Sequence, residues 1–465
     1  MTIFLKNTLS GEKEEFKSIK KGRAGIYHCG PTVYSKQHLG NISAFIYSDT
    51  LRRFLNSVGY KTKLVVNITD VGHLVSDADD GEDKMEKASQ KTNRTAREIA
   101  DEVTKQFMID LQLVNVGVSS ISFPKATENI PEQIEIIKTL EKEGFTYKIS
   151  DGIYFDTSKF SDYGKLGNIN IEGLKEGARV ESNGEKKNVT DFALWKFSNP
   201  LEKRQQEWQS PWGVGFPGWH IECSAMSRKL LGQPFDIHIG GIEHIPIHHN
   251  NEIAQSVGAF KKPLANYWIH FNHLMLNGSK LSKSDGNVMY VDELISKNIS
   301  PAIFRYWLLT TNYGAQKNLT MEALEASKSA VEKILRLIKN TKTKFFESAD
   351  KNTVEKFSAA LSDNLNSASA IAVLWEMMRD EKISASKKKK TVLMLDRVLG
   401  VGFEKLAREL KDSVIPAEVI EIAHKRELAR KNRDFTTSDK LREEAKTLGF
   451  DILDGQNGFE IKTRK

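Results

Sequence analysis

The chain has 465 residues, of which 39% are hydrophobic and 28% charged, a composition typical of a globular protein with about three domains. Its apolar runs are shorter than the roughly 18 residues that span a bilayer, and its start lacks the apolar core of a secretory signal. Two cysteines exclude a disulfide framework and fit a reducing compartment, so we expect a cytoplasmic protein that makes no membrane contact.

The net charge of +7 is concentrated late in the chain. Residues 1–315 contain 38 Lys and Arg against 37 Asp and Glu, whereas residues 316–465 contain 30 against 24. A basic excess favours a polyanionic partner for the last third, although a solvated helical surface is the simpler explanation of charge alone. The lysine run at 387–390 is expected in a solvated loop or at a helix end.

The beginning of the chain predicts strands that alternate with a helix. Residues 24–27 indicate a strand that leads into a turn at 29–31. Apolar residues near helical spacing over 45–55 then predict a helix, and the β-branched residues of 63–68 predict a second strand. Strand, helix and strand in this order predict a βαβ unit, hence an α/β fold with a parallel sheet.

The sequence pattern changes several times over the rest of the chain. Residues 76–110 are polar and helix-prone, whereas frequent turn signals predict an inserted α+β module over 120–215. A strand-and-helix pattern resumes at Pro217, and helical spacing dominates from about residue 316. A linker near 413–416 then precedes a last helix and a small terminal unit.

A short motif, His38-Leu39-Gly40-Asn41, stands where the first helix should begin. A helix N-terminus offers free N–H groups and the positive end of the helix dipole to phosphate. His38 can bond a phosphate oxygen, and Gly40 removes a side chain where a base or ribose would approach the backbone. Four residues alone are a weak signal, for which an ordinary loop histidine is the alternative.

A second motif, Lys280-Leu281-Ser282-Lys283-Ser284, is typical of a mobile cationic loop. Lys280 and Lys283 are three residues apart among small hydroxyl residues, so such a loop can close on the β- and γ-phosphates of a nucleotide. Taken alone, an exposed basic turn is the alternative.

The two cysteines stand in polar surroundings with other metal-ligating residues. Cys29 follows the first predicted strand, and Cys223 follows Trp219 by four residues. His248 and Glu252 share one face of a helix, whereas His249 points about 100° away and is a weaker candidate. Two thiolates, an imidazole and a carboxylate make a four-ligand zinc set. The spacing is long-range, so a buried apolar cysteine and a hydrogen-bonded histidine remain the alternatives.

The two phosphate motifs together resemble the paired signature of class I aminoacyl-tRNA synthetases, His-x-Gly-His and Lys-Met-Ser-Lys-Ser. Asn41 and Leu281 replace the usual His and Met; the amide of Asn41 donates a hydrogen bond but carries no proton to transfer. Longer strings, CGPTVY, PGWHIECSAMS and HHNNEIAQS, resemble the cysteinyl-tRNA synthetase family. The similarity runs from about residue 24 to the C-terminus and includes 67–71 and 433–439. Departures are Val71-Gly72-His73-Leu74 for Val-Asp-Asp-Lys, and Ile247 for Pro.

The resemblance implies a cysteine–tRNA ligase that activates L-cysteine with ATP and Mg²⁺ and charges tRNA(Cys), acting as a monomer. Zinc would recognise the substrate thiolate, because it binds sulfur far better than an alcohol. The implied metal ligands are Cys29, Cys223, His248 and Glu252. The implied amino-acid pocket contains Gly30, Thr32 and Trp219. The implied ATP site contains His38, Gly40, Asn41, Gly240, Gly241, Glu243, Lys280 and Lys283, with Glu243 on the ribose.

The resemblance also implies a domain order. A Rossmann-type catalytic domain in two halves is interrupted by a connective module, then followed by a stem-contact region with the cationic loop, a helical-bundle tRNA-binding domain and an anticodon-binding α+β unit. The corresponding residues are 1–119 and 216–270, 120–215, 271–315, 316–408 and 409–465. Expected tRNA contacts are Arg426, Arg430, Lys431 and Arg433.

Three other functions compete with this interpretation. A ligase that joins cysteine to a small amine sugar shares the catalytic core, but that family is shorter, and residues 410–465 argue against it. A zinc hydrolase would use His248 and Glu252 with metal-bound water, which two thiolate ligands and the Lys280 loop disfavour. A noncatalytic RNA-binding protein with a structural zinc is the third alternative.

Overall fold

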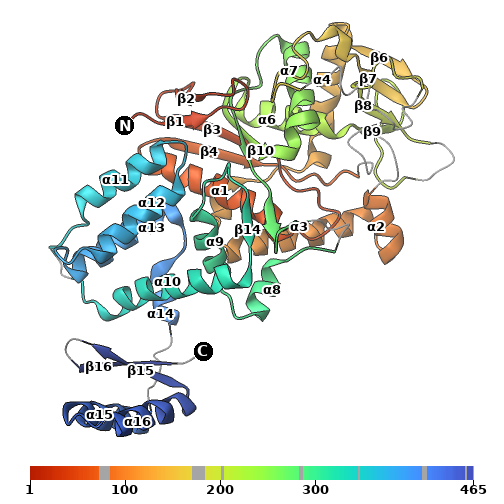
Figure 1. Ribbon diagram of the computed structural model, residues 1–465. Helices are drawn as coiled ribbons and strands as arrows, with labels where there is room; N and C mark the ends of the chain where they lie inside the picture. The colour runs from red at the N-terminus through yellow and green to blue at the C-terminus, as the bar shows by residue number, and fades with distance from the viewer. Residues whose placement is uncertain are drawn as a thin grey trace. The chain divides into compact units, whose positions relative to one another are not determined.

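The structure is a computed structural model that describes residues 1–72, 84–169, 184–199, 204–281, 286–343, 346–410, 416–455 and 458–463. It divides into two compact units, Met1–Glu404 and Lys405–Lys465 (Figure 1). None of the helices in these described ranges is long and apolar enough to cross a membrane.

A five-stranded parallel sheet forms the centre of the larger unit. Its order is β11-β10-β3-β4-β5, and every neighbouring pair is parallel. The strands are β3 (Arg23–His28), β4 (Lys61–Val66), β5 (Ile121–Ser122), β10 (Phe235–Gly241) and β11 (Ala265–Phe271). Their interiors are near-continuous apolar runs, as expected of strands covered on both faces. The predicted α/β class with a parallel sheet is therefore confirmed.

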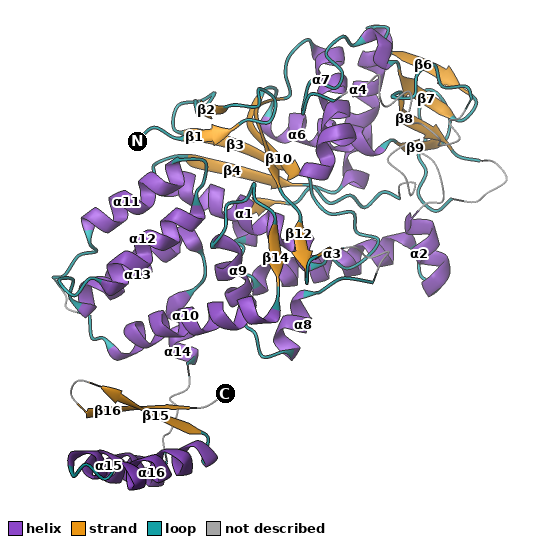
Figure 2. Cartoon of the chain, in the orientation of Figure 1, coloured by secondary structure: helices purple, strands orange, loops and turns teal. Residues whose placement is uncertain are grey.

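Helices cover both faces of this sheet, with α1 (Leu39–Ser57) on one side and α6 (Trp219–Leu231) on the other (Figure 2). The predicted βαβ unit is β3, α1 and β4, in which Ile26 lies beside Leu64. The helix-prone stretch becomes α2 (Lys84–Thr92) and α3 (Ala96–Leu113), the latter started by a capping box. The part of that stretch at 76–83 lies outside the described residues.

In its described residues, the insertion is an antiparallel sheet with α4 packed on it. The sheet order is β6-β7-β8-β9, and α4 precedes it in the chain. Their bounds are α4 (Ile130–Lys142), β6 (Thr146–Ile149), β7 (Gly152–Phe155), β8 (Phe192–Phe197) and β9 (Gly215–Pro217). One buried cluster joins Phe155 and Trp195 of the insertion to Tyr27 and Trp268 of the parallel sheet. The insertion is thus packed directly on the sheet that carries the site.

Two small elements flank the parallel sheet. The N-terminal hairpin of β1 (Phe4–Lys6) and β2 (Lys13–Glu15) packs beside β11. Three short strands, β12 (Leu274–Leu276), β13 (Ser279–Lys280) and β14 (Lys317–Leu319), form a sheet that leads into the cationic loop. Residues 282–285 of that loop, including Lys283, lie outside the described residues.

The helices that follow are α7 (Asn250–Phe260), α8 (Val291–Ser296), α9 (Pro301–Leu309), α10 (Met321–Asn340), α11 (Lys351–Ser362), α12 (Ser367–Arg379), α13 (Ala385–Leu399) and α14 (Phe403–Glu409). The lysine run expected in a loop or at a helix end lies in the first turns of α13. Its ammonium groups are not simply solvated: Lys388 donates to Met378 O at 2.8 Å and Lys389 to Thr341 O at 2.8 Å. The lysine run thus connects α13 to the C-terminal ends of α12 and α10.

The smaller unit contains α15 (Ala417–Lys431), α16 (Phe435–Thr447), β15 (Phe450–Gly455) and β16 (Gly458–Thr463). Arg426, expected to contact tRNA, is only 2% exposed and binds both carboxylate oxygens of Asp454, at 2.6 and 3.1 Å. Arg430 also reaches Asp454, at 3.2 Å. Arg426 therefore stabilises this unit internally, so its expected contact with a phosphate is not supported.

Candidate active site

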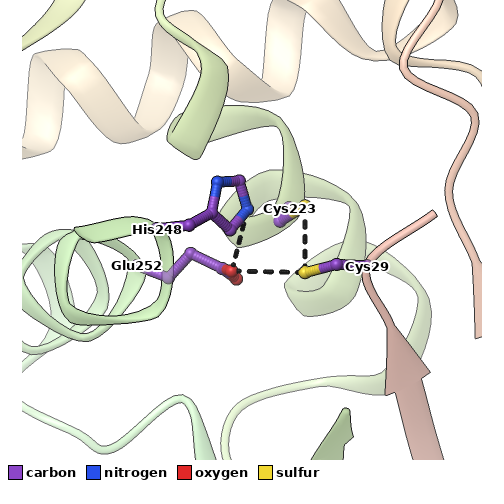
Figure 3. A group of neighbouring side chains, drawn as sticks. All are labelled: Cys29, Cys223, His248 and Glu252. Atoms are coloured by element: carbon purple, nitrogen blue, oxygen red, sulfur yellow. Dashed lines mark hydrogen bonds and ion pairs between the residues drawn. The ribbon is translucent and has the colours of Figure 1, made fainter. Parts of the chain in front are cut away.

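Four potential metal ligands from separate segments meet at the carboxyl end of β3. Cys29 follows β3 directly, Cys223 lies in α6, and Glu252 lies in the first turn of α7 just after His248. One ligand atom from each lies within 4.8 Å of the others, and all four residues are buried (Figure 3). The sulfur atoms are 3.7 Å apart, Cys29 Sγ is 3.6 Å from Glu252 Oε1, and His248 Nε2 is 3.3 Å from the same oxygen.

A glycine brings Cys29 to this position. Gly30 N donates to Asn67 Oδ1 at 2.7 Å, and a Cβ on Gly30 would lie 1.5 Å from Asn67 O. Only a residue without a side chain lets the backbone after β3 approach the backbone after β4 so closely. Asn67 Oδ1 is also 3.8 Å from Cys223 Sγ. The two strand ends and α6 are thus held together around the sulfur atoms.

The histidine pair lies in a π-helical turn, Ile245–His249, which precedes α7. The predicted approach of His248 to Glu252 is found, but His249 is also near the cluster. Its Nε2 lies 3.3 Å from Cys29 Sγ, so Cys29, His238, His249 and Glu252 form a second group that could hold an ion. In this wider turn, which ordinary helical spacing does not predict, the imidazoles of His248 and His249 both lie near the cluster.

Further histidines contact the potential ligands or the neighbouring His249. His220 Nδ1 faces His248 Nδ1 at 2.9 Å, His238 Nε2 faces Glu252 Oε2 at 2.8 Å, and His249 Nδ1 faces His270 Nε2 at 2.8 Å. The sequence interpretation missed these roles of His220, His238 and His270. A signal was present, because His238 and His270 interrupt the apolar strands β10 and β11, and a buried polar side chain needs a partner.

Burial and mutual contacts shift the protonation of the cluster. Burial opposes ionisation of Cys223, but hydrogen bonding with Cys29 and the neighbouring His248 lower its pKa to about 7. Burial, followed by the interactions with Cys223 and Glu252, raises the pKa of Cys29 well above its usual value. Burial would also raise the pKa of Glu252, yet His238 and His248 lower it to about 2. Burial opposes protonation of His248, but Cys223 and Glu252 raise its pKa to about 10. Glu252 and part of Cys223 are therefore the anionic members of the cluster near neutral pH, beside a protonated His248.

This donor set fits a metal ion. His248 Nε2 is buried and lies 3.3 Å from Glu252 Oε1, but it makes no well-aligned hydrogen bond among the described residues. A buried nitrogen so placed, beside two sulfur atoms and a carboxylate, is compatible with a cation that all four could bind. Two thiolates, one imidazole and one carboxylate are a set of four ligands that zinc accepts.

A cavity of about 530 Å³ extends from Cys29 to Lys280. Most of the site residues expected from the sequence line it, whereas Cys223, His248 and Glu252 do not. The expected residues that line it are Cys29, Gly30, Thr32, His38, Gly40, Asn41, Trp219, Gly241, Glu243 and Lys280. Gly240 does not line it; a Cβ there would lie 2.6 Å from His249 Cε1, so this glycine makes room for the imidazoles.

The first phosphate motif forms the start of α1 at the wall of this cavity. His38 is the N-cap of α1, where its Nδ1 accepts from Asn41 N at 3.3 Å. The free N–H groups of α1 therefore begin beside His38, Gly40 and Asn41, where an anion is favoured. Asn41 contributes through its backbone in this capping turn.

Residues expected beside the nucleotide and beside the amino acid also line the wall. The Glu243 side chain lies over Gly241: a Cβ on Gly241 would be 2.2 Å from the Glu243 carboxylate. Glu243 Oε2 is also 3.6 Å from His273 Nδ1. Trp219 presents its ring to His248, with the ring centroids 4.9 Å apart and tilted by 60°. The wall of the cavity thus contains an aromatic side chain that packs against His248 and an acidic side chain, Glu243.

Sequence comparison identifies the family. Residues 15–329 match the family described as "tRNA synthetases class I (C) catalytic domain". A Cysteine--tRNA ligase 1 of Burkholderia lata is 42% identical over 462 residues, which cover 99% of this chain and 97% of the relative. A Cysteine--tRNA ligase of Treponema denticola is 38% identical, covering 98% and 99%. The chain belongs to the cysteine–tRNA ligase family. The predicted family and its ligase class are confirmed, and the competing functions are not favoured.

Solved structures at low identity agree on the fold of this cysteine–tRNA ligase family member. Mycobacterium tuberculosis methionyl-tRNA synthetase in complex with methionyl-adenylate gives a TM-score of 0.55 at 12% identity, over 83% of this chain and 92% of that one. The ternary complex of Agrobacterium radiobacter K84 LeuRS with tRNA and LeuAMS gives 0.57 at 11% identity, over 85% of each chain. The class I synthetase architecture is thereby shown independently of close sequence similarity.

Proposed function

We propose that this protein activates L-cysteine with ATP, transfers the cysteinyl group to tRNA(Cys), and uses a zinc ion on Cys29, Cys223, His248 and Glu252 to recognise the substrate thiolate. The observation that carries the proposal is that Cys29, a member of this buried donor set, lines the same cavity as His38 and Lys280. The amino acid and the nucleotide would then meet within a single enclosure.

The proposed zinc site would allow the enzyme to distinguish cysteine from serine. Cysteine and serine differ by one atom, and pocket contacts alone discriminate such near-isosteres by only ~10–200-fold. Bound zinc would supply a soft Lewis-acid position that takes a thiolate in preference to a hydroxyl. Trp219 would close the wall beside that position, and Gly30 and Thr32 would line the remaining side of the amino-acid pocket.

The chain's own residues would position the two reactants for activation. The cysteine carboxylate attacks the α-phosphorus of ATP, and the bond to the bridging oxygen breaks as pyrophosphate leaves. His38 and the N–H groups at the start of α1 hold the phosphates, while Lys280, together with Lys283 and Mg²⁺, neutralises the departing charge. Gly40 and Gly241 admit the nucleotide, and Glu243 binds its ribose. A terminal ribose hydroxyl of tRNA then attacks the carbonyl carbon, and AMP leaves.

The tRNA would be bound by the basic part of the chain after residue 316. Backbone phosphates would supply much of the affinity, so charging should weaken as salt rises. Since Arg426 is occupied by Asp454, the more exposed Lys431 and Arg433 are the better candidates for contact. We expect a monomer, a cytoplasmic location and the domain roles inferred from the family.

Cysteine-dependent ATP–pyrophosphate exchange, followed by charging of a tRNA(Cys) transcript, tests the reaction. Exchange by the zinc-loaded protein and its loss on chelation, with recovery on adding Zn²⁺, are expected. Exchange without charging would instead favour the small-acceptor ligase, and no exchange would refute both. Cys223→Ser should lower bound zinc and raise the KM for cysteine, because a hydroxyl is a poor zinc ligand; full zinc content with unchanged kinetics would refute the ligand assignment.

A further inference from the structure

A line of hydrogen bonds leads from the metal cluster to the N-terminal hairpin. Cys29 Sγ faces His249 Nε2 at 3.3 Å, and His249 Nδ1 faces His270 Nε2 at 2.8 Å. His270 Nδ1 in turn faces the hydroxyl oxygen of Thr8 at 2.7 Å. Thr8 lies in the turn after β1, more than 250 residues before His270 in the sequence. The hairpin therefore reaches the cluster through two imidazoles.

The hairpin holds Thr8 firmly in place on the edge strand β11. Thr8 N donates to Trp268 O at 2.8 Å, and Asn7 Oδ1 accepts from Trp268 N at 3.0 Å. Asn7 Nδ2 also donates to Asn266 O at 3.1 Å. These bonds occupy backbone groups that an edge strand otherwise leaves open. They also fix the hydroxyl of Thr8 relative to His270, which belongs to the same strand.

The direction of these bonds follows from counting protons. A metal-bound thiolate carries no proton, and a neutral imidazole carries one N–H. A hydrogen bond to Cys29 Sγ therefore requires the N–H of His249 to be on Nε2. Its Nδ1 must then accept from His270 Nε2, so His270 Nδ1 must accept from a donor of its own. The Thr8 hydroxyl is at the right distance to be that donor.

We propose that Thr8 is a positioning residue for the metal centre: its hydroxyl selects the tautomers of His270 and His249 that direct an N–H at the Cys29 thiolate. Without that hydroxyl, His270 can place its proton on Nδ1 and present a bare Nε2 to His249. His249 would then donate its N–H to His270 and direct a lone pair at Cys29 Sγ. The thiolate would lose the hydrogen bond that stabilises its negative charge. The proposal rests on the proposed zinc site and deepens it.

The test compares three single variants of the full-length protein. Thr8→Val keeps the shape but removes the hydroxyl, Thr8→Ser keeps the hydroxyl, and Ser10→Ala removes a hydroxyl of the same hairpin that bonds Asn7 O instead. The readout is zinc transfer to a chromophoric chelator, with the thiolate-to-metal absorption of the Co²⁺-substituted protein beside it. We expect Thr8→Val to weaken zinc about tenfold, at the low end for outer partners of a metal ligand. Thr8→Ser and Ser10→Ala should stay within about twofold of the wild type.

A double-mutant cycle tests the route through His270. If Thr8 acts through that imidazole, Thr8→Val should have no further effect on zinc transfer in a His270→Gln background. Thr8→Ala removes the same hydroxyl and replaces Thr8→Val if that variant does not fold. Equal zinc transfer and equal Co²⁺ absorption in wild type and Thr8→Val would overturn the proposal, as would equal losses in Thr8→Val and Thr8→Ser. Absence of zinc from the wild type would instead refute the proposed metal site.

Discussion

Gly30→Ala should disable the metal site by separating two strand ends. The new Cβ would lie 1.5 Å from Asn67 O, and real Cβ contacts essentially never fall below 3.0 Å. The backbone after β3 must therefore retreat from the backbone after β4 by about 1.5 Å, because the obstructing atom is a carbonyl and not a flexible side chain. The bond from Gly30 N to Asn67 Oδ1, 2.7 Å long, would be lost in the same movement.

This displacement is large compared with what a metal site tolerates. Cys29 is the next residue along the chain, and zinc–ligand distances are held to within about ±0.2 Å. A shift several times larger should reduce the zinc content of purified Gly30→Ala well below one per chain. Metal analysis after gel filtration and the KM for cysteine in ATP–pyrophosphate exchange measure the effect. We expect a raised KM for cysteine with the KM for ATP much less changed.

Gly25→Ala is the matched control within the same strand. A Cβ on Gly25 would meet Asp236 and Leu231 side chains at 3.6 Å, which is ordinary van der Waals contact. Gly25→Ala should keep the zinc content and the KM for cysteine of the wild type. A loss of zinc found only in Gly30→Ala is then assigned to the disturbed backbone approach between Gly30 and Asn67. Stoichiometric zinc and a wild-type KM for cysteine in folded Gly30→Ala would show that the close approach does not position Cys29.

Three other expectations follow from ion pairs between arginine and aspartate. Arg305→Met should lower the free energy of unfolding, measured in urea, by about 3 kcal/mol. The reason is that this fully buried guanidinium donates to Asp49 Oδ2 at 2.8 Å and to Leu399 O at 2.6 Å. A loss below about 1 kcal/mol would contradict the burial argument. Burial opposes ionisation of Asp49, but Arg305 and two further arginines hold its pKa at about 2 against 3.8 in the unfolded chain. Its stabilisation is thus complete above the unfolded value and lost as pH falls through the folded one. Melting temperatures from pH 5 to pH 2 should therefore fall more steeply in wild type than in Asp49→Asn, and parallel curves would refute the assignment. Arg426→Leu should release Asp454 and unfold the smaller unit, which lowers tRNA charging while cysteine-dependent exchange stays intact; equal loss of both activities would show that the two units do not act separately.

The parts of the fold and site that the sequence predicted depend on local patterns. The β3-α1-β4 unit follows from strand and helix periodicity within residues 24–68, and its boundaries shift by only a few residues. The approach of His248 to Glu252 follows from a spacing of four residues in a helix. The family could be identified because its motifs are contiguous strings, which do not require knowledge of the tertiary structure.

The parts that the sequence did not predict depend on contacts between distant segments. His238, His270 and Thr8 approach the cluster only because β10, β11 and the hairpin lie side by side, which no local spacing encodes. The π-helical turn that admits His249 is likewise a local departure set by tertiary packing. Arg426 looked like a phosphate contact for the same reason: its partner Asp454 lies 28 residues away and across a turn.

The surrounding imidazoles fit the charge of the metal cluster. Two thiolates and a carboxylate exceed the charge of a divalent cation by one unit, and an uncompensated buried charge is costly. A lysine or arginine beside the cluster would offset that charge but would also repel the incoming ion at short range in a weakly screening interior. A neutral imidazole N–H stabilises the ligand oxygen or sulfur at hydrogen-bond distance without carrying a charge. Burial lowers the pKa of His249 and His270 well below the ordinary value, which keeps both neutral. Neutral donors, unlike cations, would therefore stabilise the ligands of the proposed site without repelling an incoming metal ion.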